Sequence, residues 1–194
     1  MPDDAAARWA GVNHLALVTN DMDETVRFYH GVLQMPLVAT LSAGPMRHYF
    51  FRIGPQSTVA FFEWAGTDIG EFEKPAGVPF TFPAQFDHVS FTLPDEAALN
   101  ALQRRLEEHK VEVTRVVDHG FVHSVYFHDN NGIALEASWW VEDATGRPAD
   151  YSDPDLFADA DPVPAVRELA QSGALASTPT THLIHEMQEI ADPA

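Results

Sequence analysis

The feature that most constrains the fold is an internal repeat. His14 lies 49 residues before Glu63, and His88 lies 48 residues before Glu136. In each copy the histidine falls in the first apolar run and the glutamate in the last, with a helical pattern and two further apolar runs between them. Because such self-similarity reports a repeated structural unit, the sequence predicts two copies of one βαβββ module.

Helix signals recur at the same place in both copies. Asp21 and Asp95 each follow the first strand and supply a side-chain N-cap. Apolar residues then recur at helical spacing over residues 21–33, and leucines do the same after the second cap. The predicted strands are residues 11–18, 37–42, 46–53 and 58–64 in the first copy and 86–93, 111–117, 124–128 and 133–138 in the second.

This order of elements predicts an α+β fold. The two modules, residues 11–64 and 86–140, would form a curved mixed sheet around a cleft, as one domain over residues 11–141. Residues 65–85, rich in Gly, Pro and Phe, read as the linker between the modules.

Two flanking segments differ in character from the repeat. Residues 1–10 read as an N-terminal arm, and residues 142–194 as an acidic, proline-rich extension with little apolar periodicity. Within the extension, residues 164–171 and 182–190 favour short helices. The extension is too short to form a second domain.

Composition excludes several classes of function. The net charge of −18 argues against nucleic acids and anionic membranes as partners, since both need basic patches. The chain has no cysteine, which excludes disulfides, thiolate metal sites and a cysteine nucleophile. No apolar run approaches the roughly 20 residues of a membrane span, and no signal-peptide pattern opens the chain. We therefore expect a cytoplasmic protein with a small-molecule substrate.

Glu136 lies in the middle of an apolar strand, residues 132–138. A buried ionised carboxylate without a partner costs several kcal/mol, so it must be paired, protonated or bound to a metal. None of the 11 Lys and Arg residues lies in this strand. A cation from outside the chain is therefore a serious candidate.

His14, Glu63, His88 and Glu136 together form a candidate metal centre. Each of them alone is more simply a structural polar residue, but two imidazoles and two carboxylates recur at matching places in the repeat. Two imidazoles and one carboxylate are the ligand set of non-haem Fe(II) sites, and a second carboxylate also suits Ni, Zn, Co or Mn. We predict a divalent metal cofactor, with Fe2+ as first choice and Mn2+, Ni2+, Zn2+ and Co2+ as alternatives.

Four segments carry a resemblance to a known superfamily. They are Gly11-Val-Asn-His14, Val26-Arg-Phe-Tyr-His-Gly-Val-Leu33, Phe86-Asp-His-Val89 and Val125-Tyr-Phe-His-Asp-Asn-Asn-Gly-Ile-Ala-Leu-Glu136. Over residues 11–140 the chain resembles the vicinal oxygen chelate superfamily, which groups glyoxalase I, extradiol dioxygenases, and fosfomycin-resistance and bleomycin-binding proteins. By this resemblance His14, His88 and Glu136 match ligand positions shared by the dioxygenases and glyoxalases. Glu63 matches the fourth ligand of glyoxalase I. Bleomycin-binding members lack these ligands, so the resemblance implies an enzyme.

The last of these segments also resembles the extradiol dioxygenase signature, a histidine followed by tyrosine, Asp-Pro-x-Gly and a glutamate. His119 and Tyr126 fit that signature, while Asn130 stands where the family has proline. The resemblance implies that Tyr126 hydrogen-bonds the substrate and that His119 or His123 handles the proton. The alternative is a structural turn role for Tyr126 and a solvated loop position for each histidine.

Three functions stay open on the sequence alone. The first is an extradiol-type ring-cleaving dioxygenase acting on a small catechol-like substrate, for which a permanently bound Glu63 would be an obstacle. The second is a glyoxalase-I-like lyase or isomerase that uses an ene-diolate, which four ligands favour. The third is a non-catalytic, resistance-type protein that binds an aromatic ligand without a metal. We expect a homodimer, and leave open whether the modules pair within one chain or across it.

Overall fold

The computed structural model describes residues 11–70, 74–78, 86–145 and 148–177. The chain divides into two compact units, Met1–Asp143 and Ala144–Ala194. The predicted N-terminal arm, residues 1–10, and the second predicted helix of the extension, residues 182–190, lie outside the described residues. Much of the predicted linker over residues 65–85 lies outside them as well.

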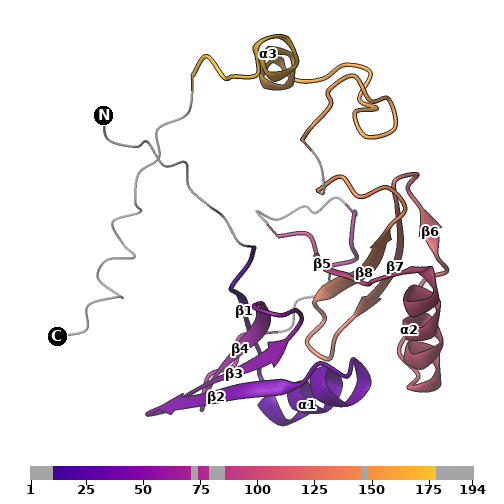
Figure 1. The fold of residues 1–194 in the computed structure, drawn as a ribbon. Coiled ribbons are helices and arrows are strands. Elements are labelled where there is room, and N and C mark those ends of the chain that lie inside the picture. Colours follow the sequence, from indigo (N-terminus) through magenta and orange to yellow (C-terminus); the bar gives the residue numbers. More distant parts are fainter. Residues whose placement is uncertain (1–10, 71–73, 79–85, 146–147, 178–194) are drawn as a thin grey trace. The chain divides into compact units, whose positions relative to one another are not determined.

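The first unit contains two modules with the same order of elements (Figure 1), which confirms the predicted βαβββ repeat. The first module consists of β1 (His14–Val18), α1 (Met22–Val26), the π-helix η1 (Arg27–Val32), β2 (Leu37–Ala43), β3 (Met46–Arg52) and β4 (Thr58–Trp64). The second consists of β5 (Val89–Thr92), α2 (Glu96–Glu108), β6 (Val117–Asp118), β7 (Val122–His128) and β8 (Ala134–Trp140).

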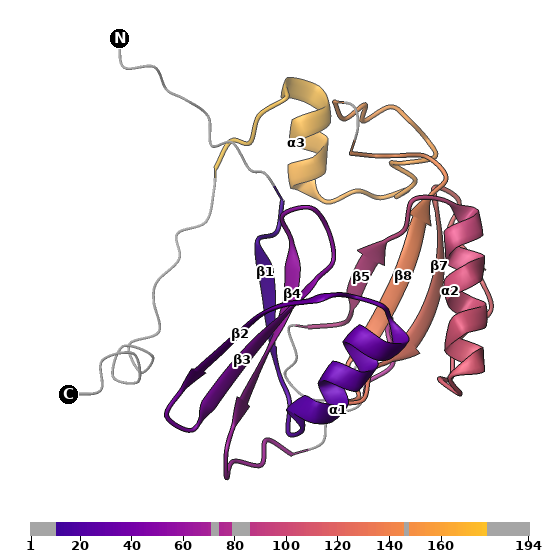
Figure 2. The ribbon, with the colours of Figure 1, turned by 60° about the horizontal axis from the view of Figure 1, so that its bottom comes forward.

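Each module forms its own four-stranded mixed sheet, and the α+β prediction is confirmed (Figure 2). The strand orders are β1-β4-β3-β2 and β5-β8-β7-β6. In both sheets the first strand pairs in parallel with the last, and the remaining pairs are antiparallel. The two sheets therefore share one topology, which allows their positions to be compared strand by strand.

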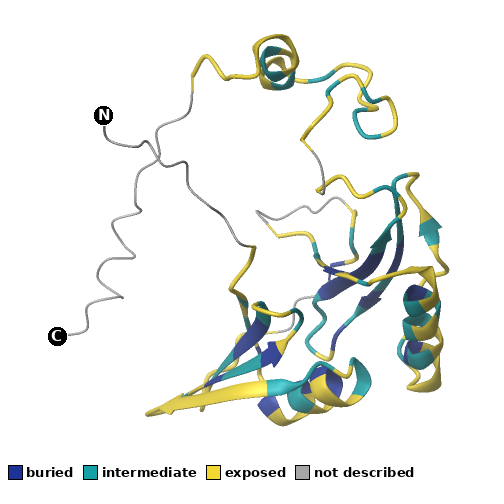
Figure 3. Cartoon of the chain, viewed as in Figure 1, coloured by how far each residue is buried: buried dark blue, intermediate teal, exposed yellow. Residues whose placement is uncertain are grey.

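Helices cover one face of each sheet, here called the helix face, and the opposite side is called the open face (Figure 3). In the first module Tyr29 of η1 packs on Phe51 and Phe61 of the sheet, and all three are fully buried. In the second module the core on this side includes Leu99 and Leu106 of α2. Burial of these side chains contributes the hydrophobic free energy that fixes each helix on its sheet.

The first helix begins at an aspartate cap, and an arginine of the other module donates hydrogen bonds to carbonyls at its end. The Oδ1 of Asp21 accepts from the Glu24 amide at 3.0 Å. At the other end Arg105 of α2 donates to the Val32 carbonyl at 2.6 Å and to the Gly31 carbonyl at 2.8 Å. These contacts satisfy carbonyls that a helix end leaves free. The predicted helix over residues 21–33 is confirmed, with its second part in π geometry.

Buried polar contacts join the two modules near the turn before β8. The Tyr29 hydroxyl donates to Oδ2 of Asp129 at 2.9 Å, and Asn130 donates to the Thr25 hydroxyl at 3.1 Å. Burial raises the pKa of Asp129, although the amides of Ile133 and Asn131 oppose that shift. The turn of the second module is thus fixed on the helix of the first.

The described part of the second unit is largely exposed. It holds α3 (Pro164–Ser172), which starts at a proline and ends at Gly173 in the left-handed conformation, φ 70°. Both signals are typical of helix ends. Among the described residues, no helix has the length and apolar character that crossing a membrane requires.

Candidate metal centre and adjoining cavity

Strand register shows which positions of the two modules correspond. Glu136 pairs with Ser90 of β5, two residues after His88. In the first module, Ala16 lies two residues after His14 on β1, and it pairs with Ala60 of β4. Ala60 is therefore the counterpart of Glu136 in the first module.

His88 lies between two carboxylates. Its Nδ1 is 2.6 Å from Oδ1 of Asp87, and its Nε2 is 3.0 Å from Oε2 of Glu136. Ionised carboxylates only accept hydrogen bonds, while a neutral imidazole has a single N–H. The ring is therefore either doubly protonated or, with the hydrogen on Nδ1, able to share a cation with Glu136 through the lone pair of Nε2.

Asp87 orients His88 from a network of its own. Its Oδ1 also accepts from the Gly77 amide at 2.7 Å, and its Oδ2 forms an ion pair with the buried ammonium of Lys74. The Gly77 amide, Lys74 and His88 hold the pKa of Asp87 well below its usual range. A carboxylate that binds the outer nitrogen of a histidine is the usual partner of a metal-binding imidazole.

Glu136 is buried, with 8% of its surface exposed. Burial raises its pKa, but the neighbouring hydroxyls of Ser124, Ser90 and Tyr126 and the charge of His88 outweigh that effect. The resulting pKa is below its ordinary value, so the carboxylate is ionised at neutral pH.

Tyr126 and His119 extend this cluster toward solvent. Tyr126 pairs directly with Glu136 across the β7–β8 ladder, and its ring contacts that of His88 edge-on, with centroids 5.9 Å apart. The Tyr126 hydroxyl lies 2.9 Å from Nε2 of the exposed His119. Burial and the negative charge of Glu136 raise the pKa of Tyr126, so its hydroxyl is protonated at neutral pH.

His123 lies on the other side of the same sheet. It pairs with Trp139, three residues after Glu136, and its ring contacts the Trp139 ring. Its Nε2 is 3.3 Å from Oδ1 of Asp118. Because successive side chains of a strand alternate between faces, His123 points away from the face that holds Tyr126.

His14 lies on the open face of the first sheet. Its Nδ1 is 2.8 Å from Oδ1 of Asn13, an oxygen that only accepts, so Nδ1 carries a hydrogen and, in the neutral ring, the lone pair is on Nε2. The neighbouring rings are those of His48 and Phe50. Burial, together with His14, lowers the pKa of His48.

The structure does not bring Glu63 to the other predicted ligands. Its Oε1 accepts from the Met22 amide at 3.1 Å, and its Oε2 forms an ion pair with Arg47. Glu63 lies three positions after Ala60, and an odd displacement along a strand moves a side chain to the opposite face. It lies on the helix face, where it caps the first helix.

Two of the four predicted ligands, His88 and Glu136, are in contact. Within the part of the chain that the structure describes, no group of three or more His, Asp or Glu residues is placed to hold a metal ion. The donor chemistry nevertheless fits a divalent ion. Asn13 and Asp87 each hold the Nδ1 of the following histidine, which leaves Nε2 to bind a metal.

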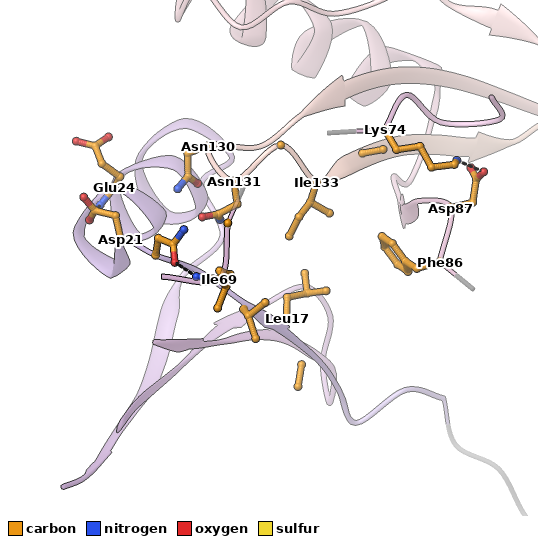
Figure 4. A pocket seen from close by; sticks show the side chains of 16 residues that line it. Leu17, Asp21, Glu24, Ile69, Lys74, Phe86, Asp87, Asn130, Asn131 and Ile133 are labelled. Atoms are coloured by element: carbon orange, nitrogen blue, oxygen red, sulfur yellow. Dashed lines mark hydrogen bonds and ion pairs between the residues drawn. The ribbon is translucent and has the colours of Figure 1, made fainter. Parts of the chain in front are cut away.

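A cavity of about 810 Å³ adjoins this region (Figure 4). Its apolar lining includes Leu17, Ile69, Phe86 and Ile133. Its polar lining includes the amides of Asn20, Asn130 and Asn131, the carboxylates of Asp21, Glu24 and Asp87, and the ammonium of Lys74. Three carboxylates against one lysine make the lining acidic.

Sequence reasoning missed the residues that orient the histidines. Asn13 and Asp87 each directly precede one of the repeated histidines, so a side-chain acceptor at that place is itself part of the repeat. Lys74 lies in the segment predicted as linker, and no local pattern pairs it with Asp87.

The fold consists of two modules, each a mixed four-stranded sheet of βαβββ topology. The open face of the second sheet carries a histidine and a carboxylate in contact, and these form a candidate metal centre. The family model described as the Glyoxalase/Bleomycin resistance protein/Dioxygenase superfamily matches residues 11–137. The chain belongs to that superfamily.

Individual relatives are distant. The chain is 28% identical over 137 residues to a Bacillus subtilis (strain 168) protein named "Putative ring-cleaving dioxygenase MhqO". That match covers 68% of this chain and only 40% of the length of the relative.

Among solved structures, a glyoxalase/bleomycin resistance protein/dioxygenase domain from Frankia sp. EAN1pec is 23% identical with a TM-score of 0.59. The match covers 69% of this chain and 99% of the Frankia chain. Glyoxalase I from Leishmania major is 16% identical with a TM-score of 0.50, over 66% and 84% of the two chains. These two structures share the fold.

Proposed function

We propose that this chain is a divalent-metal-dependent enzyme, an extradiol-type ring-cleaving dioxygenase that acts on a small catechol-like substrate. The observation that carries the proposal is the placement of His88 between Asp87 and Glu136, at 2.6 and 3.0 Å. This arrangement offers an oriented imidazole nitrogen next to a carboxylate oxygen, a donor pair that suits a divalent cation.

In this proposal the Nε2 atoms of His14 and His88 and the carboxylate of Glu136 hold the ion. Fe2+ is the first choice, because two histidines and one carboxylate are the ligand set of non-haem iron oxygenases. Mn2+, Ni2+, Zn2+ and Co2+ are the alternatives. When bound, the ion would supply Lewis-acid chemistry at two adjacent substrate oxygens.

The chain itself supplies orientation and proton transfer. Asp87 keeps Nε2 of His88 directed at Glu136. The Tyr126 hydroxyl, protonated at neutral pH, accepts the proton of a substrate hydroxyl as it passes its own hydrogen to Nε2 of His119, 2.9 Å away. His119 is exposed and releases that proton to solvent.

The cavity indicates the class of substrate. Asp87 belongs to its lining and also holds His88, so the cavity adjoins the proposed centre. Its apolar residues suit a flat ring, and its amides suit hydroxyl groups. The excess of carboxylates disfavours anionic substrates, including a glutathione conjugate. A neutral catechol fits these requirements.

Two further observations favour the dioxygenase over the glyoxalase-like alternative. The Bacillus subtilis relative, of which the match covers 40%, carries the name "Putative ring-cleaving dioxygenase MhqO". A fourth ligand, Glu63, would favour the glyoxalase-I-like function, but Glu63 accepts from the Met22 amide and pairs with Arg47.

Oxygen uptake by the Fe2+-loaded protein tests the proposal. We expect the anaerobically loaded protein to consume oxygen with neutral catechols and to form a yellow ring-fission product. Glu136→Gln should abolish this activity. His109→Ala serves as a control, because His109 lies at the end of α2 and its ring contacts the Arg105 carbonyl there. Absence of oxygen uptake across the panel, with wild type and Glu136→Gln binding no metal, would point to a resistance-type binding protein.

We also propose a cytoplasmic homodimer. Members of a superfamily built from paired modules that bind small molecules often oligomerise, and the exposed β2 strand leaves an edge available for association. Light scattering on the purified protein should give a mass close to twice the chain mass of 21.5 kDa. A monomer mass across the accessible concentrations would contradict the dimer.

A further inference from the structure

β2 (Leu37–Ala43) is the outermost strand of the first sheet, and its outer edge is open. The strand order β1-β4-β3-β2 leaves β2 paired with β3 alone among the described strands. Every residue of β2 after Leu37 is exposed. Proteins that stay monomeric usually protect such an edge with charged side chains or proline, because its unpaired N–H and C=O groups can pair with another chain. The sequence of β2 contains neither a charged residue nor a proline.

The hairpin between β2 and β3 determines which main-chain groups of β2 face outward. A two-residue turn, Gly44-Pro45, follows Ala43 directly. Residues that flank such a turn exchange hydrogen bonds with each other, and along the ladder these pairs alternate with pairs that do not. Ala43 and Leu41 therefore bond toward β3, whereas Thr40 and Ser42 direct their N–H and C=O groups to the open edge.

This edge is complementary to a second copy of itself in antiparallel orientation. With a two-fold axis at Leu41, Thr40 of each strand lies opposite Ser42 of the other, and their outward groups form main-chain hydrogen bonds on both sides of the axis. Leu41 then lies opposite its own symmetry mate in a pair without hydrogen bonds, where side chains approach most closely. Leu41 is 56% exposed in the single chain, so the contact removes apolar surface from water. The irregularity between Leu37 and Ala39 precedes this stretch.

The side chains around Leu41 also favour a second copy as the partner. Leu41 ends a row across the open face, in which Val18 pairs with Phe62, Phe62 with His48, and His48 with Leu41. A two-fold contact at Leu41 continues this row into the same row of the second copy, as an isologous interface requires. The net charge of −18 makes two copies repel each other, and the uncharged β2 is a place where they can approach at low cost.

We propose that two copies of this chain associate through β2, paired antiparallel about a two-fold axis at Leu41. The two first-module sheets then form one continuous sheet. This inference rests on the proposed homodimer and assigns its interface. His14 lies on β1, at the other end of the strand order, so the contact does not use this proposed metal ligand.

Cysteine cross-linking tests the register, because the chain has no cysteine of its own. In Leu41→Cys the two sulfurs face each other across a pair whose Cα atoms lie about 4.5 Å apart, which a disulfide can span. Thr40→Cys is the matched control, since the two-fold axis places its two copies diagonally, beyond the roughly 7 Å limit for a disulfide. Under mild oxidation we expect Leu41→Cys to form a covalent dimer and Thr40→Cys to remain uncross-linked.

A charge at the axis tests the contact in solution. Leu41→Asp places two like charges opposite each other, which destabilises a strand pair. At a concentration where the wild type is dimeric, we expect light scattering to shift from about twice the chain mass of 21.5 kDa to the monomer mass. Val163→Asp makes the same change of charge at a residue of the second unit that is 60% exposed, and it should remain dimeric.

The outcomes separate this interface from the homodimer itself. If the wild type is dimeric while Leu41→Asp stays dimeric and Leu41→Cys does not cross-link, the interface is wrong and the homodimer stands. If the wild type is monomeric and Leu41→Cys does not cross-link, both are wrong. Equal cross-linking of Thr40→Cys and Leu41→Cys would overturn the register. If circular dichroism shows that Leu41→Asp does not fold, the cross-linking of Leu41→Cys decides the case.

Discussion

The two modules have the same topology, but different side chains lie on their open faces. In the second, Glu136 lies among Ser90, Ser124 and Tyr126 and contacts His88. At the position of Glu136 the first module has Ala60, and the surrounding side chains of its open face are largely aromatic. The repeated feature is a histidine on the first strand with Nδ1 held by the preceding residue. The comparison indicates that the second module carries the carboxylate chemistry, while the first contributes imidazole and a ring-binding surface.

The largest effect on activity should distinguish Glu136 from Glu63, the two glutamates at matching places in the repeat. Glu136→Gln removes a charge from the proposed ligand set, and we expect at least about a 1,000-fold loss of oxygen-uptake activity. Glu63→Gln changes only a helix-face contact and should retain activity within about threefold at a temperature where it is folded. Steady-state kinetics on the Fe2+-loaded proteins measures both. Equal losses in the two variants would contradict the difference between the modules.

Tyr126 tests whether the hydroxyl beside Glu136 takes part in the reaction. Tyr126→Phe removes the hydroxyl that contacts His119 and should lower kcat about 100-fold, since positioned acid–base groups contribute that much or more. Phe50 is the register counterpart of Tyr126, because Phe50 pairs with Ala60 as Tyr126 pairs with Glu136. Phe50→Leu should change KM more than kcat. A larger loss of kcat in Phe50→Leu would reverse the assigned roles.

Asp87 tests the orientation of the second histidine and carries a pH dependence. Asp87→Asn should weaken metal binding about 10- to 100-fold, as loss of such a partner typically does. The pKa of Asp87 is lowered in the folded state by the Gly77 amide, Lys74 and His88, so its stabilisation is complete above its unfolded pKa of about 4. It is lost as the pH falls below that value. The stability difference between wild type and Asp87→Asn should therefore shrink below about pH 4 in urea titrations. A difference that grows on acidification would contradict the assignment.

The contact between the modules should show a smaller, purely structural effect. Tyr29 is fully buried and donates to Asp129, so Tyr29→Phe leaves that carboxylate with one donor fewer. We expect a loss of about 1.5 to 3 kcal/mol in the free energy of unfolding. Tyr49→Phe is the control, since the Tyr49 hydroxyl makes no hydrogen bond among the described residues. An equal loss in both variants would show that the Asp129 contact is not the cause.

The smallest expected effect concerns Glu63 as a helix cap. Glu63→Ala removes the acceptor of the Met22 amide and the partner of Arg47. Loss of a helix cap typically costs about 1 kcal/mol, and the ion pair adds little because Arg47 is half exposed. Thermal unfolding should show this modest decrease with unchanged metal content. Loss of the metal in this variant would place Glu63 back among the ligands.

The sequence predicted the repeat, the helix caps and the pairing of His88 with Glu136, because each depends on local periodicity or on matched spacing. It could not give the register of β4. Counting from the histidines matched Glu63 to Glu136. The register counterpart of Glu136 is instead Ala60, which follows His14 by 46 residues, whereas Glu136 follows His88 by 48. The difference arises within the modules, where turns and loops vary in length without a periodic signal. The ion pair of Lys74 with Asp87 could not be predicted either, because it depends on the tertiary position of Lys74 and not on a local pattern.

Anomalous X-ray diffraction from Fe2+- or Co2+-loaded crystals, recorded at the absorption edge of the metal, tests the central claim most directly. The account predicts an anomalous peak about 2 Å from Nε2 of His88 and from a carboxylate oxygen of Glu136. It also predicts imidazole from the first module at the same ion. A peak beside Glu63, or a fully loaded crystal with no peak at His88 and Glu136, would contradict it.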